Sequence, residues 1–319
     1  MSRVLVTGAF GYVGLAVVRG LAGHEITAFG HAPRNPAARA AIPSNVRVRE
    51  GDIEAAFDVL AELGPFDAIL HLAGGGGPAK LAADPVAGVR TNIRATSELC
   101  LRAREQGTKR LIFASTIAVY GTFRDHGRPY SEADSALPDD IYGAVKEAAE
   151  HVWVRHAGGT SLRIANVYGA GSGVDMGVNG AVERFARAAA EGGEIKIFGT
   201  GSQRIDYVHV DDVVRAFAAA LEHPSPPPVV NVGGGAPIAI ADLAERAIEA
   251  GRAIGTAPAL RREPAPPGKS WPDRSLAIDL AKSALGWAPR VTYEEGVAEL
   301  VRMMAANASA PSRNGGSHS

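Results

Sequence analysis

Tyr142 and Lys146 stand four residues apart in the segment Tyr-Gly-Ala-Val-Lys and together could transfer protons. On a helix, residues at i and i+4 lie on one face, so the phenol and the ammonium group would be neighbours. A neighbouring Lys favours the phenolate and lowers the pKa of a Tyr from its ordinary value of about 10, which makes the phenol an acid or base near neutral pH. The same spacing is common where a helix starts with a packed Tyr and a solvated Lys, so the pair needs context.

Three glycines, Gly8, Gly11 and Gly14, lie in the run VLVTGAFGYVG at positions 4–14. Glycines allow a tight turn and a close approach of the backbone to a pyrophosphate, and the N-terminus of the following helix supplies free N–H groups. The spacing is G-x-x-G-x-x-G rather than G-x-G-x-x-G, so the predicted strand before it and helix behind it carry the argument. The run predicts a dinucleotide site; the alternative is an ordinary strand–helix turn.

The residues after the second predicted strand bear on which dinucleotide binds. An acid there binds the ribose 2′-OH of NAD, whereas a basic residue accommodates the 2′-phosphate of NADP. Gly30 stands at the position of the acid, and His31 and Arg34 follow. The cofactor prediction is therefore NAD, with NADP left open, and Arg34 could equally be a solvated loop residue. Asp52, after the third predicted strand, could accept a hydrogen bond from an adenine amino group or cap the next helix.

A hydroxyl-bearing segment, FASTIAVYG at positions 113–121, closes the fifth predicted strand. In open α/β sheets, ligands bind at the carboxyl ends of the strands. Thr116 is therefore expected to hydrogen-bond a substrate oxygen beside Tyr142.

Strands and helices alternate through the first half of the chain, which predicts a parallel sheet covered on both faces. The fold class is α/β, a Rossmann-like doubly wound parallel sheet with a smaller α/β substrate-binding domain. The predicted strands are 3–7, 25–29, 46–50, 68–72, 111–114 and 161–164, and the main helices are 12–21, 89–106 and 142–156.

The second half of the chain has shorter elements and more breaks. It begins with a Gly-rich loop at 169–180 and contains a Pro-rich stretch, 260–271, expected to be an irregular loop. We predict a dinucleotide-binding domain at 1–168 with 202–235 returning to it, a substrate-binding domain at 169–201 and 236–306, and a disordered tail at 307–319. The predicted strands are 195–198, 205–210 and 229–232, and the helices are 182–191, 212–222, 239–249, 279–284 and 293–306.

The composition excludes several kinds of partner. Lys plus Arg number 33 and Asp plus Glu 34, a net charge of −1, so neither nucleic acid nor an anionic membrane is an expected partner. One cysteine, Cys100, rules out a disulfide within the chain and argues against a metal site, so we expect a small core residue there. The chain opens on a strand with no signal-peptide pattern and contains no apolar run of about 18 residues, so the expected compartment is the cytoplasm.

In this order, the motifs resemble the extended short-chain dehydrogenase/reductase family, specifically its nucleotide-sugar epimerase/dehydratase branch. The resemblance runs from Arg3 to about Met304. It includes Asn92 and the further segments 71–73 (HLA), 162–169 (LRIANVYG), 206–213 (DYVHVDDV), 231–235 (NVGGG) and 285–287 (LGW).

The resemblance implies an NAD(P)-dependent enzyme in which Tyr142 is the acid–base group, Lys146 lowers its pKa and holds the nicotinamide ribose, and Thr116 orients the reacting oxygen. It implies structural roles for His71 and for His209 with Asp211 and Asp212, the latter in a network between domains. The implied substrate contacts are Gly75, Thr116, Asn166 and Arg204. The implied cofactor contacts are Gly8, Phe10, Gly11, Tyr12, Val13, Gly14, His31, Arg34, Asp52, Ile53, Leu72, Ala73, Gly74, Asn92, Ser115, Tyr142, Lys146 and Ile164.

Within that family, residues that are missing narrow the reaction. The 4,6-dehydratases carry Asp-Glu directly after the catalytic Ser/Thr, where this chain has Ile117 and Ala118, and the decarboxylases usually carry Glu at the second position. The 3,5-epimerase/reductases use a Cys near that motif, whereas Cys100 lies outside it. A nucleotide-sugar 4-epimerase that oxidises C4 transiently is favoured. The alternatives are an NADPH-dependent ketoreductase of a keto-(deoxy)sugar nucleotide or related carbonyl compound, and a non-catalytic cofactor-binding sensor.

The contacts to the substrate's diphosphate depart from the family pattern. The usual Arg before the Asp-Tyr of the second-domain strand is Ile205 here, with Arg204 one residue earlier and therefore on the opposite face. A second basic position reads PPGK at 266–269, so Arg261, Arg262 or Lys269 would have to substitute. The Gly74–Gly77 run also departs from the family. Relatives commonly dimerise through two helices per subunit, which would be 89–106 and 142–156 here.

Overall fold

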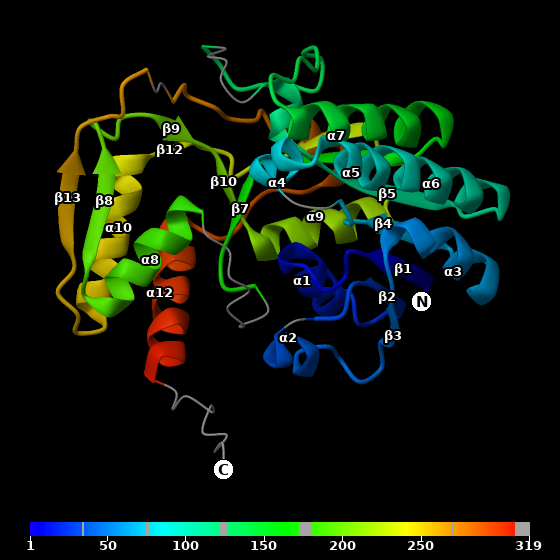
Figure 1. The fold of residues 1–319 in the computed structure, drawn as a ribbon, viewed down its shortest axis with the longest axis horizontal. Coiled ribbons are helices and arrows are strands. Elements are labelled where there is room, and N and C mark those ends of the chain that lie inside the picture. Colours follow the sequence, from blue (N-terminus) through cyan, green and yellow to red (C-terminus); the bar gives the residue numbers. More distant parts are fainter. Residues whose placement is uncertain (34, 75–76, 122–126, 172–179, 269–270, 310–319) are drawn as a thin grey trace.

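Seven parallel strands form one continuous sheet in the larger part of the molecule (Figure 1). Their spatial order is β11-β6-β5-β4-β1-β2-β3. The structure, a computed structural model, describes residues 1–33, 35–74, 77–121, 127–171, 180–268 and 271–309. The strands are β1 Arg3–Thr7, β2 Glu25–Gly30, β3 Arg47–Glu50, β4 Ala68–His71, β5 Arg110–Thr116, β6 Thr160–Ile164 and β11 Val229–Val232.

Helices cover both faces of this sheet, and each face has its own apolar core. On one face α1 and α9 pack against each other and contribute Val17 and Phe217 to the core. On the other face α3, α6 and α7 contribute Leu60, Cys100 and Ala149. The helices are α1 Tyr12–Gly20, α2 Pro36–Ala40, α3 Ala56–Leu63, α4 Pro78–Ala83, α5 Pro85–Val89, α6 Ala95–Glu105, α7 Ile141–His151, α9 Val210–Glu222 and α11 Asp279–Leu285. The predicted Rossmann-like, doubly wound arrangement is confirmed, and Cys100 is a buried core residue.

The two long predicted helices each contain an irregular turn. A π-helical turn at Arg90–Arg94 separates α5 from α6, and a second one, Val152–His156, ends α7. Such single turns occur often next to functional sites, because they turn a side chain out of the regular helical register. The first turn includes Asn92, one of the predicted cofactor contacts.

A smaller set of elements, at the left of Figure 1, packs around a third apolar core. Its strands β8 and β13 pair in parallel, and its helices are α8, α10 and α12. The bounds are α8 Ala181–Glu191, β8 Glu194–Phe198, α10 Ile240–Ala253, β13 Ala259–Glu263 and α12 Tyr293–Ser309.

Two predictions in this part are wrong. The stretch 260–271 is predicted to be an irregular loop, but its first four residues, 260–263, belong to strand β13, in which Leu260 pairs with Ile195. Its sequence, ALRRE, carries no strand pattern, and the pairing comes from the free edge of β8. The predicted tail begins too early, because α12 continues through 307–309 up to Ser309. Nothing in Asn-Ala-Ser breaks a helix, and the first proline is Pro311; the rest of the tail lies outside the described residues.

Short strand pairs join the two parts of the molecule. The predicted strand 205–210 is interrupted at Asp206: β9 Arg204–Ile205 pairs with β12 Ile238–Ala239, and β10 Tyr207–His209 pairs with β7 Asn166–Tyr168. We propose the domain boundaries given above, with 202–235 belonging to the large sheet because it contains β11. In this division α11 falls within the second domain's stretch, although Ala281 packs in the first core.

Candidate functional site

The glycine-rich turn after β1 brings the backbone of three segments into close contact. Gly8 has φ +66°, and a Cβ there would lie 2.6 Å from Ala73 N. A Cβ on Gly14 would lie 2.1 Å from Gly8 O. Helix α1 starts after Gly11 with no side-chain cap, so the N–H groups of its first turn are left to bind an anion such as a pyrophosphate.

Replacing Gly14 with alanine should therefore disrupt the site while a glycine nearby tolerates the same change. The Gly14→Ala methyl group cannot fit without moving the backbone of Gly8, so we expect a loss of about 1–3 kcal/mol in the free energy of unfolding and of dinucleotide binding. Gly23→Ala is the control, since nothing lies within 4 Å of its Cβ position. Urea unfolding and a dinucleotide titration measure both variants; equal behaviour of the two would contradict the close approach.

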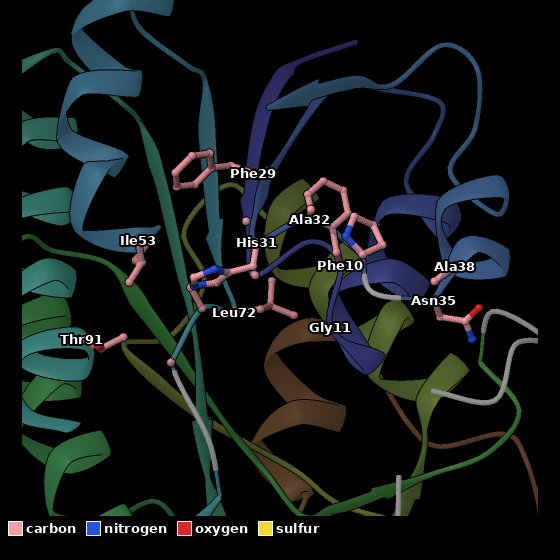
Figure 2. Close-up of a pocket in the computed structure, with 15 residues that line it drawn as sticks. Phe10, Gly11, Phe29, His31, Ala32, Asn35, Ala38, Ile53, Leu72 and Thr91 are labelled. Carbon is pink, nitrogen blue, oxygen red and sulfur yellow. The ribbon is translucent and has the colours of Figure 1, made fainter. Parts of the chain in front are cut away.

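A cavity of about 650 Å³ opens beside this turn, at the carboxyl ends of the strands (Figure 2). In Figure 2, Ile53 and Thr91 lie on one side, Phe10 and Asn35 on the other, and His31 between them. The size is within the ordinary range for a cofactor site. The lining residues are Gly8, Phe10, Gly11, Phe29, Gly30, His31, Ala32, Pro33, Asn35, Ala38, Ile53, Leu72, Ala73, Gly74 and Thr91.

Eight of the predicted cofactor residues line this cavity, and several residues were missed. The missed residues at the end of β2, Phe29 and Gly30, could have been found, because the carboxyl end of a strand in such a sheet faces the ligand. Asn35 and Thr91 carried no signal in the sequence. Arg34 and Gly75 lie outside the described residues. The eight predicted cofactor residues that line it are Gly8, Phe10, Gly11, His31, Ile53, Leu72, Ala73 and Gly74.

The predicted residues Tyr12, Val13, Gly14, Asp52, Asn92, Ser115, Tyr142, Lys146 and Ile164 do not line this cavity. The Tyr12 hydroxyl points toward the smaller part of the molecule, where it donates to Gly169 O at 2.6 Å. Ser115 and Ile164 are buried at the ends of β5 and β6. The first turn of α1, which contains Tyr12, Val13 and Gly14, can therefore contact a ligand through its backbone only.

His31 and Asp52 pair at the mouth of the cavity, with Nε2 and Oδ2 3.2 Å apart. The other carboxylate oxygen of Asp52 accepts from Glu54 N at 2.9 Å, so Asp52 does cap the short helix that follows. A Cβ on Gly30 would have no atom nearer than 3.5 Å. A Cβ atom therefore fits at position 30 in ordinary van der Waals contact, and crowding at that atom does not explain the glycine.

Lys146 is buried where three elements meet. A Cβ on Gly74 would lie 3.3 Å from Lys146 Nζ and 2.8 Å from Asn92 Oδ1, so these groups converge on one point. Nζ lies 4.3 Å from the centre of the Phe113 ring. Burial lowers the pKa of Lys146 to about 8, and the Glu150 carboxylate opposes that effect. The ammonium group thus lies beside the cavity and forms no ion pair with a described residue.

Tyr142 and Thr116 interact through their hydroxyl groups. Thr116 Oγ1 accepts from Ala118 N at 3.2 Å, which leaves its proton free to donate to the Tyr142 oxygen. Burial raises the pKa of Tyr142, and the Thr116 hydrogen bond is what favours the phenolate. The prediction that Lys146 lowers the pKa of Tyr142 is wrong for the protein without its cofactor. Burial of the phenol is the larger effect, and Lys146 does not contribute to the shift.

His71 is held as a neutral structural residue, as predicted. Its Nδ1 lies 2.6 Å from Thr7 Oγ1 and its Nε2 2.9 Å from Thr96 Oγ1. The ring stacks against both Phe113 and Trp153, and burial lowers its pKa to about 3. It therefore fixes β4 against β1 and α6 and is not available for proton transfer near neutral pH.

The arginines near the expected substrate site are not arranged as the sequence predicts. Arg204 is exposed, and its guanidinium donates to Pro237 O at 2.7 Å, so part of its donor capacity is used by the backbone. Arg274, which the sequence analysis missed, pairs in register with Ile205. Its Nε is buried with no hydrogen-bond partner among the described residues. Only its place beside Ile205 reveals it, and that register cannot be read from the sequence.

Asn166 lies where the two parts of the molecule meet. Its side-chain Nδ2 donates to Asp206 O at 2.9 Å, so its amide oxygen is oriented by that contact. Asp206 in turn accepts from Gly234 N and Leu276 N, and burial raises its pKa to about 6. Asn166 is thus held by a rigid set of backbone contacts next to the segment that carries Arg274.

In the described part of the chain, no group of three or more His, Cys, Asp or Glu side chains is arranged to bind a metal ion. Among the same residues, none of the helices combines the length and apolar character needed to cross a bilayer.

The residues present fit a dinucleotide. The glycine turn allows the approach that a pyrophosphate needs, the cavity has the necessary size, and a buried ammonium group and a Thr–Tyr hydroxyl pair lie next to it. This arrangement can bind a dinucleotide and move a proton beside it.

Comparison with known proteins agrees with this geometry. The chain is 28% identical to a probable UDP-glucuronate 4-epimerase of Rhizobium meliloti (strain 1021), over 94% of this chain and 96% of the relative. It is 36% identical to a dTDP-6-deoxy-L-talose 4-dehydrogenase (NAD(P)(+)) of Kitasatospora kifunensis, over 60% of this chain and 61% of that one. The solved UDP-glucose 4-epimerase of Thermotoga maritima with UDP-glucose matches 96% of this chain and 99% of its own with a TM-score of 0.83 and 29% identity.

The family model described as NAD dependent epimerase/dehydratase matches residues 4–233, which contain the glycine turn, the cavity and the Thr–Tyr–Lys cluster. The chain belongs to the NAD-dependent epimerase/dehydratase family.

Proposed function

We propose that this protein is a nucleotide-sugar 4-epimerase that uses NAD. The observation that carries the proposal is the cluster of Thr116, Tyr142 and Lys146 beside the dinucleotide cavity, with only the uncharged, buried Ile117 and Ala118 following Thr116. Such a site can move one hydroxyl proton but offers no second acid–base pair at those positions for an elimination. The similarity to UDP-sugar 4-epimerases supports the same reading.

In the proposed mechanism each residue has one task. Tyr142 takes the proton of the C4 hydroxyl as that carbon is oxidised to a ketone, and returns it when the carbon is reduced from the other face. Thr116 orients the reacting oxygen, and Lys146 hydrogen-bonds the cofactor's ribose from the position it shares with Asn92. The N–H groups at the start of α1 hold the pyrophosphate. NAD, when bound, supplies the acceptor and then the donor of hydride, so no net oxidation occurs.

Denaturing the purified protein and identifying the dinucleotide that it releases tests the proposal directly. An epimerase recycles its cofactor in place, so we expect NAD in an amount close to one per chain. The same preparation should interconvert a UDP-sugar and its 4-epimer with no added dinucleotide. An empty protein that reduces a keto-sugar nucleotide with added NADPH would overturn the epimerase proposal.

That second outcome would support the alternative, an NADPH-dependent ketoreductase. The observation in its favour is Gly30, which leaves no carboxylate at the end of β2 to repel a 2′-phosphate, with His31 next to it in the cavity wall. The similarity to a 4-dehydrogenase that uses NAD(P) also fits. A non-catalytic sensor is the least supported reading, since it has no need of the three side chains of the Thr116–Tyr142–Lys146 cluster.

Arg274 is proposed as the cation for the substrate's diphosphate in place of the missing Arg at position 205. It pairs with Ile205, and its unpartnered Nε gives it a donor to spare. Charge-assisted hydrogen bonds are worth about 1.5–3 kcal/mol, so Arg274→Met should raise the KM for a nucleotide sugar by roughly 10- to 100-fold. Arg204→Met is the control and should leave the KM within about twofold. Equal effects of the two substitutions would contradict this assignment.

We also propose a homodimer and a cytoplasmic location. The dimer would form through 89–106 and 142–156, where the apolar side chains of Val89 and Leu101 are exposed to 45% and 44%. Exposed apolar side chains on neighbouring helices favour association. Light scattering on the purified protein measures the mass, and a Leu101→Glu substitution should convert a dimer to a monomer.

A further inference from the structure

Helix α7 carries a third polar group in line with Tyr142 and Lys146. Glu150 follows Lys146 by four residues, as Lys146 follows Tyr142, so the phenol, the ammonium and the carboxylate share one face of the helix. Lys146 and Glu150 are both 5% exposed. The proposed reaction assigns no task to Glu150, and a buried carboxylate is costly to keep without one.

The Glu150 carboxylate is fixed in place by residues of β6. Arg163 Nε lies 3.1 Å from one of its oxygens and 3.2 Å from the other. The Ser161 hydroxyl donates to it at 2.8 Å. Arg163 also lies over the ring of Tyr120, 4.7 Å from its centre. The carboxylate therefore cannot turn toward Lys146 to form a contact ion pair, and it acts on the ammonium group as a fixed charge.

The surroundings of Lys146 make that fixed charge important. Phe113 lies under the ammonium group, and Asn92 and Gly74 face it with uncharged atoms. His71, which stacks on Phe113, is neutral. Among the described residues, Glu150 is the group whose charge favours the ammonium form of Lys146, and it opposes the burial that disfavours that form.

We propose that Glu150 is a positioning residue that keeps Lys146 in its ammonium form for cofactor binding, and that Arg163 holds the Glu150 carboxylate at the distance this requires. The proposal rests on the proposed role of Lys146. A charged donor makes the stronger hydrogen bond to a ribose hydroxyl, so loss of the charge weakens the hold on the cofactor.

The sign of the pH dependence follows from Lys146. Its pKa in the folded protein is lowered from 10.5 to about 8, so the charge is present below about pH 8 and is lost as the pH rises through that value. Removing the negative charge of Glu150 should lower the pKa of Lys146 further. Cofactor binding should then weaken at a lower pH than in the unchanged protein.

The experiment measures NADH binding by fluorescence, on protein stripped of cofactor, between pH 6 and 9.5. In Glu150→Gln we expect the half-loss of binding to move by about one pH unit to the acid side, which is roughly a fivefold weaker Kd at pH 8. Glu147→Gln is the matched control, because it removes a carboxylate from the same helix at a partly exposed position; its profile should not move.

A Lys146→Met background separates this role from a purely structural one. In that background Glu150→Gln should change the Kd for NADH by less than twofold, because there is no ammonium group left to influence. Equal weakening in both backgrounds, or an unchanged pH profile, would overturn the proposal.

If Glu150→Gln fails to fold because Arg163 is left unpaired, the double substitution Glu150→Gln/Arg163→Met removes both charges. It should still show an acid shift, smaller than that of Glu150→Gln alone, because the loss of the Arg163 cation favours the ammonium form of Lys146. Since the readout is dinucleotide binding, failure here is distinct from failure of the epimerase proposal, which concerns turnover.

Discussion

Tyr142→Phe is expected to lower kcat for sugar epimerisation by about 10²- to 10⁴-fold, the range for losing a positioned acid–base group. The phenylalanine ring fills the same space, so NADH affinity and the free energy of unfolding should stay close to those of the unchanged protein. Steady-state kinetics with a UDP-sugar, a dinucleotide titration and urea unfolding measure the three quantities on the same preparations.

The structure also predicts an effect of replacing Thr116. Burial raises the pKa of Tyr142, so the phenolate that takes the substrate proton depends on the Thr116 hydrogen bond, which favours it. Thr116→Val should therefore also lower kcat, by less than Tyr142→Phe does, while NADH binding is retained. A Tyr142→Phe protein with more than a tenth of the original kcat would mean that another group moves the proton.

The second large effect concerns the free energy of unfolding, on which we expect the adjacent residues Asp211 and Asp212 to act very differently. Asp212 is fully buried and accepts hydrogen bonds from Arg290 N at 2.8 Å and Val291 N at 3.1 Å, and it also contacts Arg215. Asp212→Ala leaves these donors unpaired, and we expect a loss of about 3–5 kcal/mol in the free energy of unfolding. The network ties α9 to the segment before α12, so the cost falls on the contact between the two parts of the molecule.

Asp211→Ala is the control for this stability measurement. The Asp211 side chain is 55% exposed, and His209, 3.8 Å away, is no strong ion-pair partner because burial lowers the pKa of its ring. We expect a change below about 1 kcal/mol. Urea denaturation of the three proteins at one pH gives the comparison. Similar losses in the two variants would show that the backbone bonds of Asp212 contribute little.

The large sheet could be predicted because its strands carry their own signal. Strands β1 and β4 are mostly apolar, since helices cover both faces, and turns with glycine separate such strands from the helices. The site at their carboxyl ends followed from the same logic, which placed Gly8, Thr116 and the Tyr142–Lys146 pair at one edge of the sheet.

The parts that escaped prediction depend on contacts between distant segments. The residues of β13 form a strand only because β8 offers a free edge, and Arg274 reaches the site because its backbone pairs with Ile205. The raised pKa of Tyr142 is of the same kind, because it depends on how deeply the fold buries the phenol. Local sequence pattern contains none of this information.

The position of β11 has a consequence for synthesis on the ribosome. This strand pairs with β6 at the end of the large sheet, yet the chain makes α8 and β8 of the second part, and then α9, before reaching it. About 65 residues separate the two strands, which takes roughly 3–13 s at ~5–20 residues per second. Throughout that interval the nascent chain has β6, a strand buried along its whole length in the finished protein, as an unpaired edge. We expect the nascent chain to depend most on chaperones during those seconds.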